Sequence, residues 1–322
     1  MRTISKNQLN VSVVALKSKK EKIAQRTRLP LLAACAVLVF CACTKSPLET
    51  VDAPAKQKTI AGKVALEDFI SPEETFVWLE GFNLGTRADQ GGGYQIELPE
   101  KGFQSVLPGG VEGVFKLYFF NANYFIKTLD LVVLNGEFVN GKGDILSTGA
   151  LSRHLTLANI VTIRTEVSVP AIKASYDSTL TVSVLVSPVD IADSVKVRFP
   201  DLAEQSVARV FLKGIESDNM LNLTSSRFSV AELGEEPLTV DELTSLQEVR
   251  DRPLLLTIEL EWRSGLAAAD DYWVLPYLLI DHQDVPVDLL ENMGVDLSNP
   301  LESFHKIPYG IHAAKLMVLP SE

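Results

Sequence analysis

The three cysteines carry the most distinctive chemistry in this chain, because a thiol can be acylated, oxidised or bound to a metal. Cys35, Cys41 and Cys43 all lie near the N-terminus, in or just after an uncharged apolar run that starts at residue 29. Eight lysines and arginines and a single glutamate precede that run. A basic segment followed by an apolar segment of this length is typical of a secretory signal peptide. The run is too short to cross a bilayer, which needs about 20 apolar residues.

The same segment resembles the lipid-attachment region of bacterial lipoproteins. Leu32-Ala33-Ala34-Cys35 matches the lipobox of that family well, but cleavage there leaves too few apolar residues for a signal peptide. Phe40-Cys41-Ala42-Cys43 is a poorer motif that leaves the whole apolar run upstream, and bulky Phe40 disfavours cleavage before Cys41. We therefore predict a signal peptide over residues 1–42 and lipidation at Cys43, with Cys35 as the alternative.

This resemblance implies a cell-envelope protein that is held in a membrane by lipid chains, such as palmitate, on Cys43. Stable anchoring takes more than one chain. No aspartate follows the cysteine, which implies the outer membrane under sorting of the enterobacterial type. Residues 43–57 are polar with two prolines, so we expect a lipidated tether. An uncleaved N-terminal membrane anchor and an ordinary secreted protein are the alternatives.

Histidine and carboxylate side chains offer little metal-binding chemistry. The four histidines are scattered, with no HExxH motif and no pair at helical spacing. The candidates for a calcium site are carboxylates in two predicted loops, Asp270, Asp271, Asp281 and Asp284. Calcium takes hard oxygen ligands from loops, but the regular spacing and glycine of an EF-hand are missing here. We expect solvated loop charges, no bound metal and no cofactor.

Motifs for catalysis are also missing from the sequence. It contains no GxSxG nucleophile motif, no P-loop and no GxGxxG fingerprint, and Gly91-Gly92-Gly93 indicates a turn. We expect no enzyme activity, with a hydrolase built from distant loops as the alternative. Trp78, Trp262 and Trp273 are the aromatic platforms that a carbohydrate-binding sandwich would need. Each lies in an apolar strand pattern, so we expect all three in the core.

Composition limits the partners. Cleavage before Cys43 leaves 280 residues, enough for two domains of ordinary size. That body has no further cysteine, which excludes disulfides and cysteine-based zinc or redox sites. It retains 22 basic and 40 acidic residues, a net charge of −18. A strongly acidic surface repels nucleic acid. The expected partners are the membrane, through the anchor, and a protein or glycan that the sequence does not identify.

Short apolar runs with turn signals between them predict β-strands after the tether. The first series covers residues 60–64, 76–80, 94–98, 115–120 and 127–134. The glycine run at 91–93 and Asn135-Gly136 mark turns in this series. Several short strands with this punctuation favour a β-sandwich.

The first series also resembles the carboxypeptidase regulatory-like domain, a small transthyretin-like β-sandwich. The matching segments are Ile60-x-Gly62-x-Val64, Val77-x-Leu79-x-Gly81 and Gly93-Tyr94-x-Ile96-x-Leu98-Pro99. Asn123-Tyr124 stands where the family has a Gly-Tyr pair, and residues 101–113 contain an insertion. The resemblance covers about residues 58–145 and implies a non-catalytic module without the zinc ligands of carboxypeptidases. We expect this first domain to extend over residues 58–148.

A second series predicts another domain over residues 149–322. Its strands are expected at 160–169, 179–186, 194–199, 207–212, 254–262, 272–280 and 311–319. This spacing resembles an immunoglobulin-like sandwich. One helix is predicted over 239–250, where Thr239 and Glu242 form a capping box. The sequence thus predicts an all-β protein of tandem sandwiches, with one short helix in the second. The expected function is non-catalytic binding or scaffolding at a membrane surface, with a carbohydrate-binding accessory lipoprotein as the alternative.

Overall fold

The computed structural model describes stretches of the chain that all belong to one unit, Pro54–Glu322. They are residues 54–68, 70–104, 110–189, 195–199, 207–217, 219–238, 246–249, 251–282, 285–296 and 299–321. The predicted signal peptide and both candidate lipidation sites, Cys35 and Cys43, lie outside these residues. Within them, no helix has the length and apolar character needed to cross a membrane.

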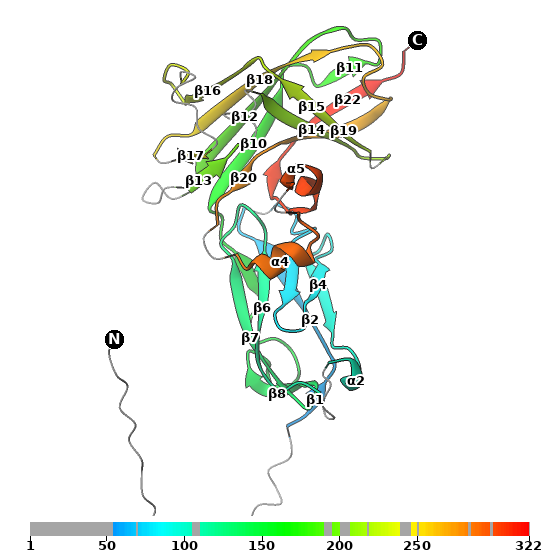
Figure 1. The fold of residues 1–322 in the computed structure, drawn as a ribbon, viewed down its shortest axis with the longest axis vertical. Coiled ribbons are helices and arrows are strands. Elements are labelled where there is room, and N and C mark those ends of the chain that lie inside the picture. Colours follow the sequence, from blue (N-terminus) through cyan, green and yellow to red (C-terminus); the bar gives the residue numbers. More distant parts are fainter. Residues whose placement is uncertain are drawn as a thin grey trace, which may run out of the picture. The chain divides into compact units, whose positions relative to one another are not determined.

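The protein is all-β, as predicted, and its first part is a β-sandwich (Figure 1). One sheet has the strand order β1-β8-β7-β6-β3-β4 and the other has the order β5-β2-β9. The strands are β1 Lys56–Gln57, β2 Thr59–Leu66, β3 Phe76–Leu79, β4 Leu84–Arg87, β5 Gly93–Glu97, β6 Gly113–Phe120, β7 Lys127–Leu134, β8 Glu137–Gly143 and β9 Leu155–Leu157. A helical turn, α2, covers Lys101–Gln104.

Both predicted turns of this sandwich are confirmed. Asn135 and Gly136 have φ values of 54° and 74° and join β7 to β8, as a two-residue hairpin turn requires. In the glycine run, Gly92 has a φ of 77°. The Asp89 carboxylate accepts hydrogen bonds of 2.8 Å from the backbone N–H groups on both sides of Gly92. An aspartate that bonds its own following backbone fixes the turn before β5.

The second part is a larger sandwich. Its two five-stranded sheets have the orders β16-β18-β12-β10-β21 and β11-β22-β19-β14-β15, and β17-β13-β20 forms a small third sheet. The strands are β10 Val161–Val167, β11 Ala171–Lys173, β12 Ser178–Pro188, β13 Val195–Arg198, β14 Ala208–Gly214, β15 Met220–Ser225, β16 Phe228–Glu232, β17 Leu246–Val249, β18 Leu254–Trp262, β19 Asp270–Pro276, β20 Leu279–Ile280, β21 Ile311–His312 and β22 Ala314–Leu319.

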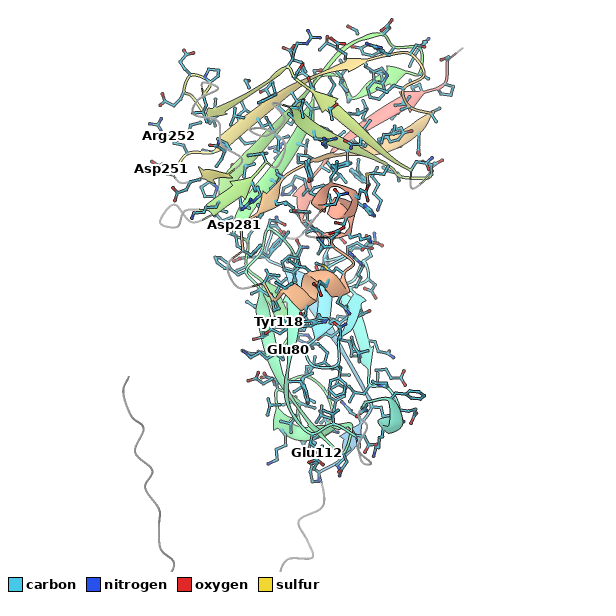
Figure 2. The ribbon with its side chains drawn as sticks, in the orientation of Figure 1. Glu80, Glu112, Tyr118, Asp251, Arg252 and Asp281 are labelled. Atoms are coloured by element: carbon cyan, nitrogen blue, oxygen red, sulfur yellow. The ribbon has the colours of Figure 1, made fainter. Side chains whose placement is uncertain are left out.

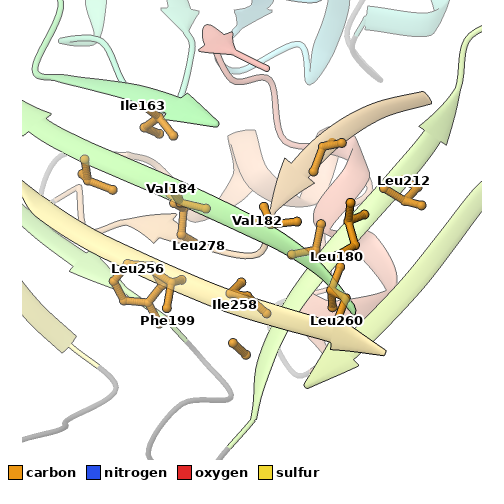
Figure 3. Close-up of a cluster of buried hydrophobic side chains, with 14 of the residues drawn as sticks. Ile163, Leu180, Val182, Val184, Phe199, Leu212, Leu256, Ile258, Leu260 and Leu278 are labelled. Atoms are coloured by element: carbon orange, nitrogen blue, oxygen red, sulfur yellow. The ribbon is translucent and has the colours of Figure 1, made fainter. Parts of the chain in front are cut away.

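Strict alternation of apolar residues builds the second core (Figure 3). Along β12, Leu180, Val182 and Val184 are fully buried, while the residues between them are not. β12 pairs with β18 so that Val182 lies opposite Ile258, which is also fully buried. Each buried Val, Leu or Ile stabilises the fold by about 1.5–3 kcal/mol relative to its exposed state. The separate first core extends to Leu157, and the predicted boundary near residue 148 stays a prediction.

The predicted helix over 239–250 is wrong where the structure describes it. Residues 246–249 form β17, which pairs with β13 so that Val249 lies opposite Val195. Gln247 and Val249 are buried and Glu248 is exposed, so the segment follows a strand period of two. Pairing with another strand has overridden a helical pattern that was local to the sequence. Residues 239–245 and 250 lie outside the described part.

A helix late in the sequence packs on the first sandwich rather than on the second. This helix, α4 (Val287–Asn292), lies beside strands of the first sandwich (Figure 1). Its Leu289 joins Phe76, Trp78 and Phe120 in one buried apolar cluster. The Asn292 side chain also donates to a first-sandwich backbone carbonyl, 2.8 Å away. The C-terminal part of the chain therefore covers a face that the first sandwich alone would expose.

Buried asparagines join the two sandwiches just before β21. The Asn123 side chain donates to the Gly310 carbonyl at 2.7 Å and accepts from the Gly310 N–H at 2.8 Å. The same side chain donates to the Val161 carbonyl, and Asn121 accepts from the Gly310 N–H at 3.0 Å. Buried polar groups need such partners. The Asn123 position, where the resembled family has glycine, thus holds β6, β10 and β21 in one arrangement.

Candidate functional site

Trp273 is exposed on the outer face of a second-sandwich sheet, although its sequence context predicted a core position. It is 41% exposed, whereas Trp78 and Trp262 are 2% and 1% exposed and confirm their predicted core positions. Successive side chains of a strand point to opposite faces. Because Tyr272 and Val274 point into the core, Trp273 must point outward.

Two lysines flank Trp273 across the sheet. Lys213 on β14 and Lys315 on β22 are its direct cross-strand partners. Cross-strand partners share one face, so the indole lies between two long cationic side chains. Lys315 also forms an ion pair with Asp271 at 2.7 Å. The result is a flat aromatic surface bordered by hydrogen-bond donors.

A cleft of about 720 Å³ lies beside Trp273. Strands β14, β15 and β19 supply one side, and the first sandwich supplies the side around Glu74 and Arg87. The segment from Phe304 to Ala313 supplies the rest of the lining. This segment includes η1 (Phe304–Lys306), which follows α5 (Pro300–Ser303). The volume falls in the range of small-molecule binding clefts in proteins.

Arg87 fixes the wall that the first sandwich contributes. One guanidinium nitrogen is 2.8 Å from a Glu74 carboxylate oxygen, and the other donates to the Lys306 carbonyl at 2.6 Å. The guanidinium also lies over the Phe76 ring, 5.8 Å from its centre. Arginine can hold several partners at once because its donors are arranged as a rigid fork. Arg87 therefore connects β4 to η1 at the edge of the cleft.

A cluster of aromatic rings packs around Phe304, which lines the cleft. Phe304 stacks on Phe211 with ring centres 5.1 Å apart, and the Tyr277 and Tyr309 rings lie 5.0 and 5.5 Å from it. Tyr309 donates to the Leu278 carbonyl at 2.9 Å. The enclosure of its hydroxyl raises the pKa of Tyr309, so the phenol stays neutral at ordinary pH. The supporting layer is thus apolar and closely packed.

The remaining lining mixes apolar side chains, such as Met220 and Leu275, with polar groups that are open to solvent. His305 and His312 are exposed on the cleft, and Glu73 and Glu74 lie on the side of the first sandwich. Imidazole groups donate and accept hydrogen bonds, and carboxylate groups accept them. Together with the lysines beside Trp273, these groups suit a ligand that has both a flat apolar face and several polar groups. Among the residues of the cleft, the sequence singled out only Trp273 as a possible ligand platform, because the others come from segments far apart in the chain.

Three of the four candidate metal ligands lie in the described part of the chain, and they do not form one site. Ser217 supplies two hydrogen bonds to Asp270, and these bonds lower the pKa of this carboxyl group. Asp271 pairs with Lys315, as described above. Asp281 lies apart from both, after β20, in a separate cavity of about 210 Å³ near the junction (Figure 2). Asp284 lies outside the described residues, among which no group of three His, Cys, Asp or Glu side chains is arranged for a metal ion.

No protein-family model matches this chain, and the search of curated proteins gives no match either. The resemblance of about residues 58–145 to the carboxypeptidase regulatory-like domain thus stays a prediction that rests on sequence pattern. The cleft beside Trp273 is the candidate site on structural grounds alone. The sequence identified Trp273 as a possible aromatic platform, but its apolar neighbours led to a predicted core position, because that pattern does not show which residues face inward.

Proposed function

We propose that this protein is a non-catalytic lipoprotein of the cell envelope, anchored through Cys43, that binds a ligand in the cleft beside Trp273. The basic and apolar N-terminal segment supports the anchor. The buried contacts of Asn123 with Gly310 support a body in which the sandwiches hold a fixed arrangement. A fixed arrangement matters because both sandwiches line the cleft.

The observation that carries this proposal is the exposed indole of Trp273, which lines a large cleft that has both apolar and polar side chains. Tryptophan is enriched where proteins bind partners, because one ring offers a large apolar area and a polar N–H group. A glycan is the ligand class that this observation favours. The apolar face of a sugar ring can stack on the indole while its hydroxyls bond to the neighbouring lysine and histidine side chains.

Binding can be tested by affinity electrophoresis of residues 44–322 in gels that contain soluble polysaccharides, and by co-sedimentation with peptidoglycan. We expect slower migration or co-sedimentation with at least one glycan, and its loss in Trp273→Ala. Met317→Ala is the matched control, because Met317 is exposed on the neighbouring strand of the same sheet but does not line the cleft. Equal binding by Trp273→Ala and the unsubstituted body would exclude this cleft as the glycan site.

The same incubations test the non-catalytic part of the proposal. New reducing ends released from a polysaccharide, and lost in His305→Ala or His312→Ala, would make the protein a hydrolase instead. The anchor is tested separately by metabolic labelling of the full chain with a palmitate analogue. We expect label on the unsubstituted protein and none on Cys43→Ser. Label that persists in Cys43→Ser and disappears in Cys35→Ser would move the anchor to Cys35.

A further inference from the structure

The end of the first sandwich where the tether joins carries exposed apolar side chains. Phe103 on α2 is 86% exposed, the highest value among the large apolar side chains of the described residues. Val114 at the start of β6, Leu134 at the end of β7 and Leu146 after β8 are also exposed. These four residues make up the apolar tip of the first sandwich. Large apolar side chains that gather in one place on a surface commonly mark a contact with a membrane or a protein.

Hydrogen bonds place the residues of the apolar tip around the start of the described chain. The Gln104 side chain donates to the Gly136 carbonyl at 2.9 Å, which brings α2 beside the β7–β8 turn. On the other side, the Gln57 side chain donates to the Gly149 carbonyl at 2.8 Å, which brings the loop of Leu146 beside β1. Figure 1 shows α2, β1 and β8 gathered at this end. Figure 2 labels Glu112 at the same end.

We propose that the apolar tip contacts and inserts into the bilayer that holds the lipid chains of Cys43. This inference rests on the proposed lipid anchor. Twelve residues separate Cys43 from Lys56, the first residue of β1. A chain of that length reaches at most about 43 Å when fully extended. The anchor therefore keeps the tether end of the first sandwich close to the membrane.

The direction of the strands places the candidate cleft away from the membrane. β6 and β7 each contain eight residues, so about 26 Å separates their two ends. The tip lies at the start of β6, whereas Asn121 and Asn123, which bind Gly310, follow its end. When the tip contacts the bilayer, the junction and its cleft project into the aqueous space.

Lysines near the tip are paired with glutamates, so we expect membrane contact to depend on the apolar side chains rather than on attraction to anionic lipids. Lys58 forms an ion pair with Glu100 at 2.6 Å, and Lys101 forms one with Glu137 at 3.3 Å. A few apolar side chains bind a membrane weakly from solution. The anchor makes the second contact intramolecular, and a short linker raises the effective concentration to the millimolar range. We therefore expect the tip to insert only in the anchored protein.

The test uses residues 43–322, which include the whole described unit and contain Cys43 as the single cysteine. Coupling Cys43 to maleimide lipids in phosphatidylcholine vesicles supplies an anchor without the cell's own acylation. Phe103→Trp then reports the depth of the tip through quenching by brominated phosphatidylcholine. Leu233→Trp is the matched control, because Leu233 is exposed in a turn of the second sandwich, next to β16.

We expect the added tryptophan at position 103 to be blue-shifted and quenched on anchored vesicles, relative to the unsubstituted conjugate. The tryptophan at position 233 should show neither change. Unquenched fluorescence from Phe103→Trp, or equal quenching at both positions, would overturn the proposal. Because the anchor is chemical, that outcome leaves lipidation of Cys43 in cells to be decided by the labelling experiment alone.

Discussion

Buried side-chain amides connect the two sandwiches at Gly310. Asn123 satisfies both backbone groups of Gly310 although the two residues are 187 positions apart in sequence. Gly310 also lies against Tyr124, whose hydroxyl donates to Asp68 at 2.7 Å. Burial and this hydrogen bond raise the pKa of Tyr124, so its hydroxyl stays protonated. Because these buried groups contact one another, a substitution at one of them should lower the stability of the protein clearly.

Replacing Asn123 by alanine should lower the free energy of unfolding by about 1–3 kcal/mol, because the buried Gly310 carbonyl loses the amide that donates to it, while Asn121 still accepts from the Gly310 N–H. Chemical denaturation of residues 44–322 measures this loss. Asn222→Ala is the control, because Asn222 is exposed and its side chain accepts a hydrogen bond only from Arg209 among the bonds described. It should change the free energy by no more than about 0.5 kcal/mol. Equal effects of the two substitutions would contradict a structural role for Asn123.

Gly310→Ala should also be destabilising, by about 1–3 kcal/mol, because an added methyl group overfills the site. A Cβ atom at this position would lie 2.5 Å from the Tyr124 hydroxyl oxygen and 2.6 Å from a ring carbon. Gly102→Ala provides the comparison, since a Cβ atom there has no heavy atom within 4 Å. The melting temperatures of the two variants should differ by several degrees. Equal melting temperatures would show that the structure around Gly310 accommodates the added methyl group without loss of stability.

At the scale of elements, α4 matters more than its six residues suggest. It follows the second sandwich in sequence but buries Phe76, Trp78 and Phe120 of the first. Without α4, the first sandwich would present these three side chains to water. The predicted first domain over residues 58–148, made from strand patterns, did not include this cover.

Leu289→Ala should therefore lower the free energy of unfolding by about 2–5 kcal/mol, the usual cost of a cavity at a fully buried leucine. Val287 lies on the same helix and is 54% exposed, so Val287→Ala should have little effect. The measurement is chemical denaturation followed by tryptophan fluorescence, which also reports on Trp78. A small effect of Leu289→Ala would mean that α4 adds little to the first sandwich.

At the scale of the whole molecule, enclosed phenols should set the alkaline limit of stability. Burial raises the pKa of Tyr94, Tyr124 and Tyr309 above the ordinary value for tyrosine. The folded state thus holds these protons more tightly than the unfolded chain. Their contribution to stability is complete below about pH 10 and is lost as the pH rises further.

Denaturation midpoints should accordingly be steady from pH 8 to about pH 10 and fall steeply above it. Tyr94→Phe removes one of these phenols while keeping a ring of nearly the same shape, so its midpoint should fall less steeply with pH. Absorbance at 295 nm, which follows tyrosinate formation, should rise together with the loss of near-ultraviolet circular dichroism. A Tyr94→Phe slope equal to that of the unsubstituted protein would show that other groups control alkaline unfolding.

Local patterns in the sequence determined the all-β fold, many strands and two turns of this protein. Alternation along residues 179–186 predicted β12, and Asn135-Gly136 predicted the turn after β7. These features depend on residues that are close in the chain, because side chains alternate with a period of two and glycine permits positive φ. The signal peptide is likewise predicted from local sequence, because a basic segment directly precedes the apolar run before Cys43.

Tertiary structure decided the features that depend on residues far apart. Strand pairing with β13 turned the helical pattern of residues 246–249 into β17. The inward direction of Tyr272 and Val274 placed Trp273 outside, although all three residues read alike in sequence. The cleft exists because both sandwiches and η1 meet there, and the partners of Asn123 lie 187 positions away. A period of two says that neighbouring residues face opposite ways, but only packing against the rest of the molecule decides which way is inward.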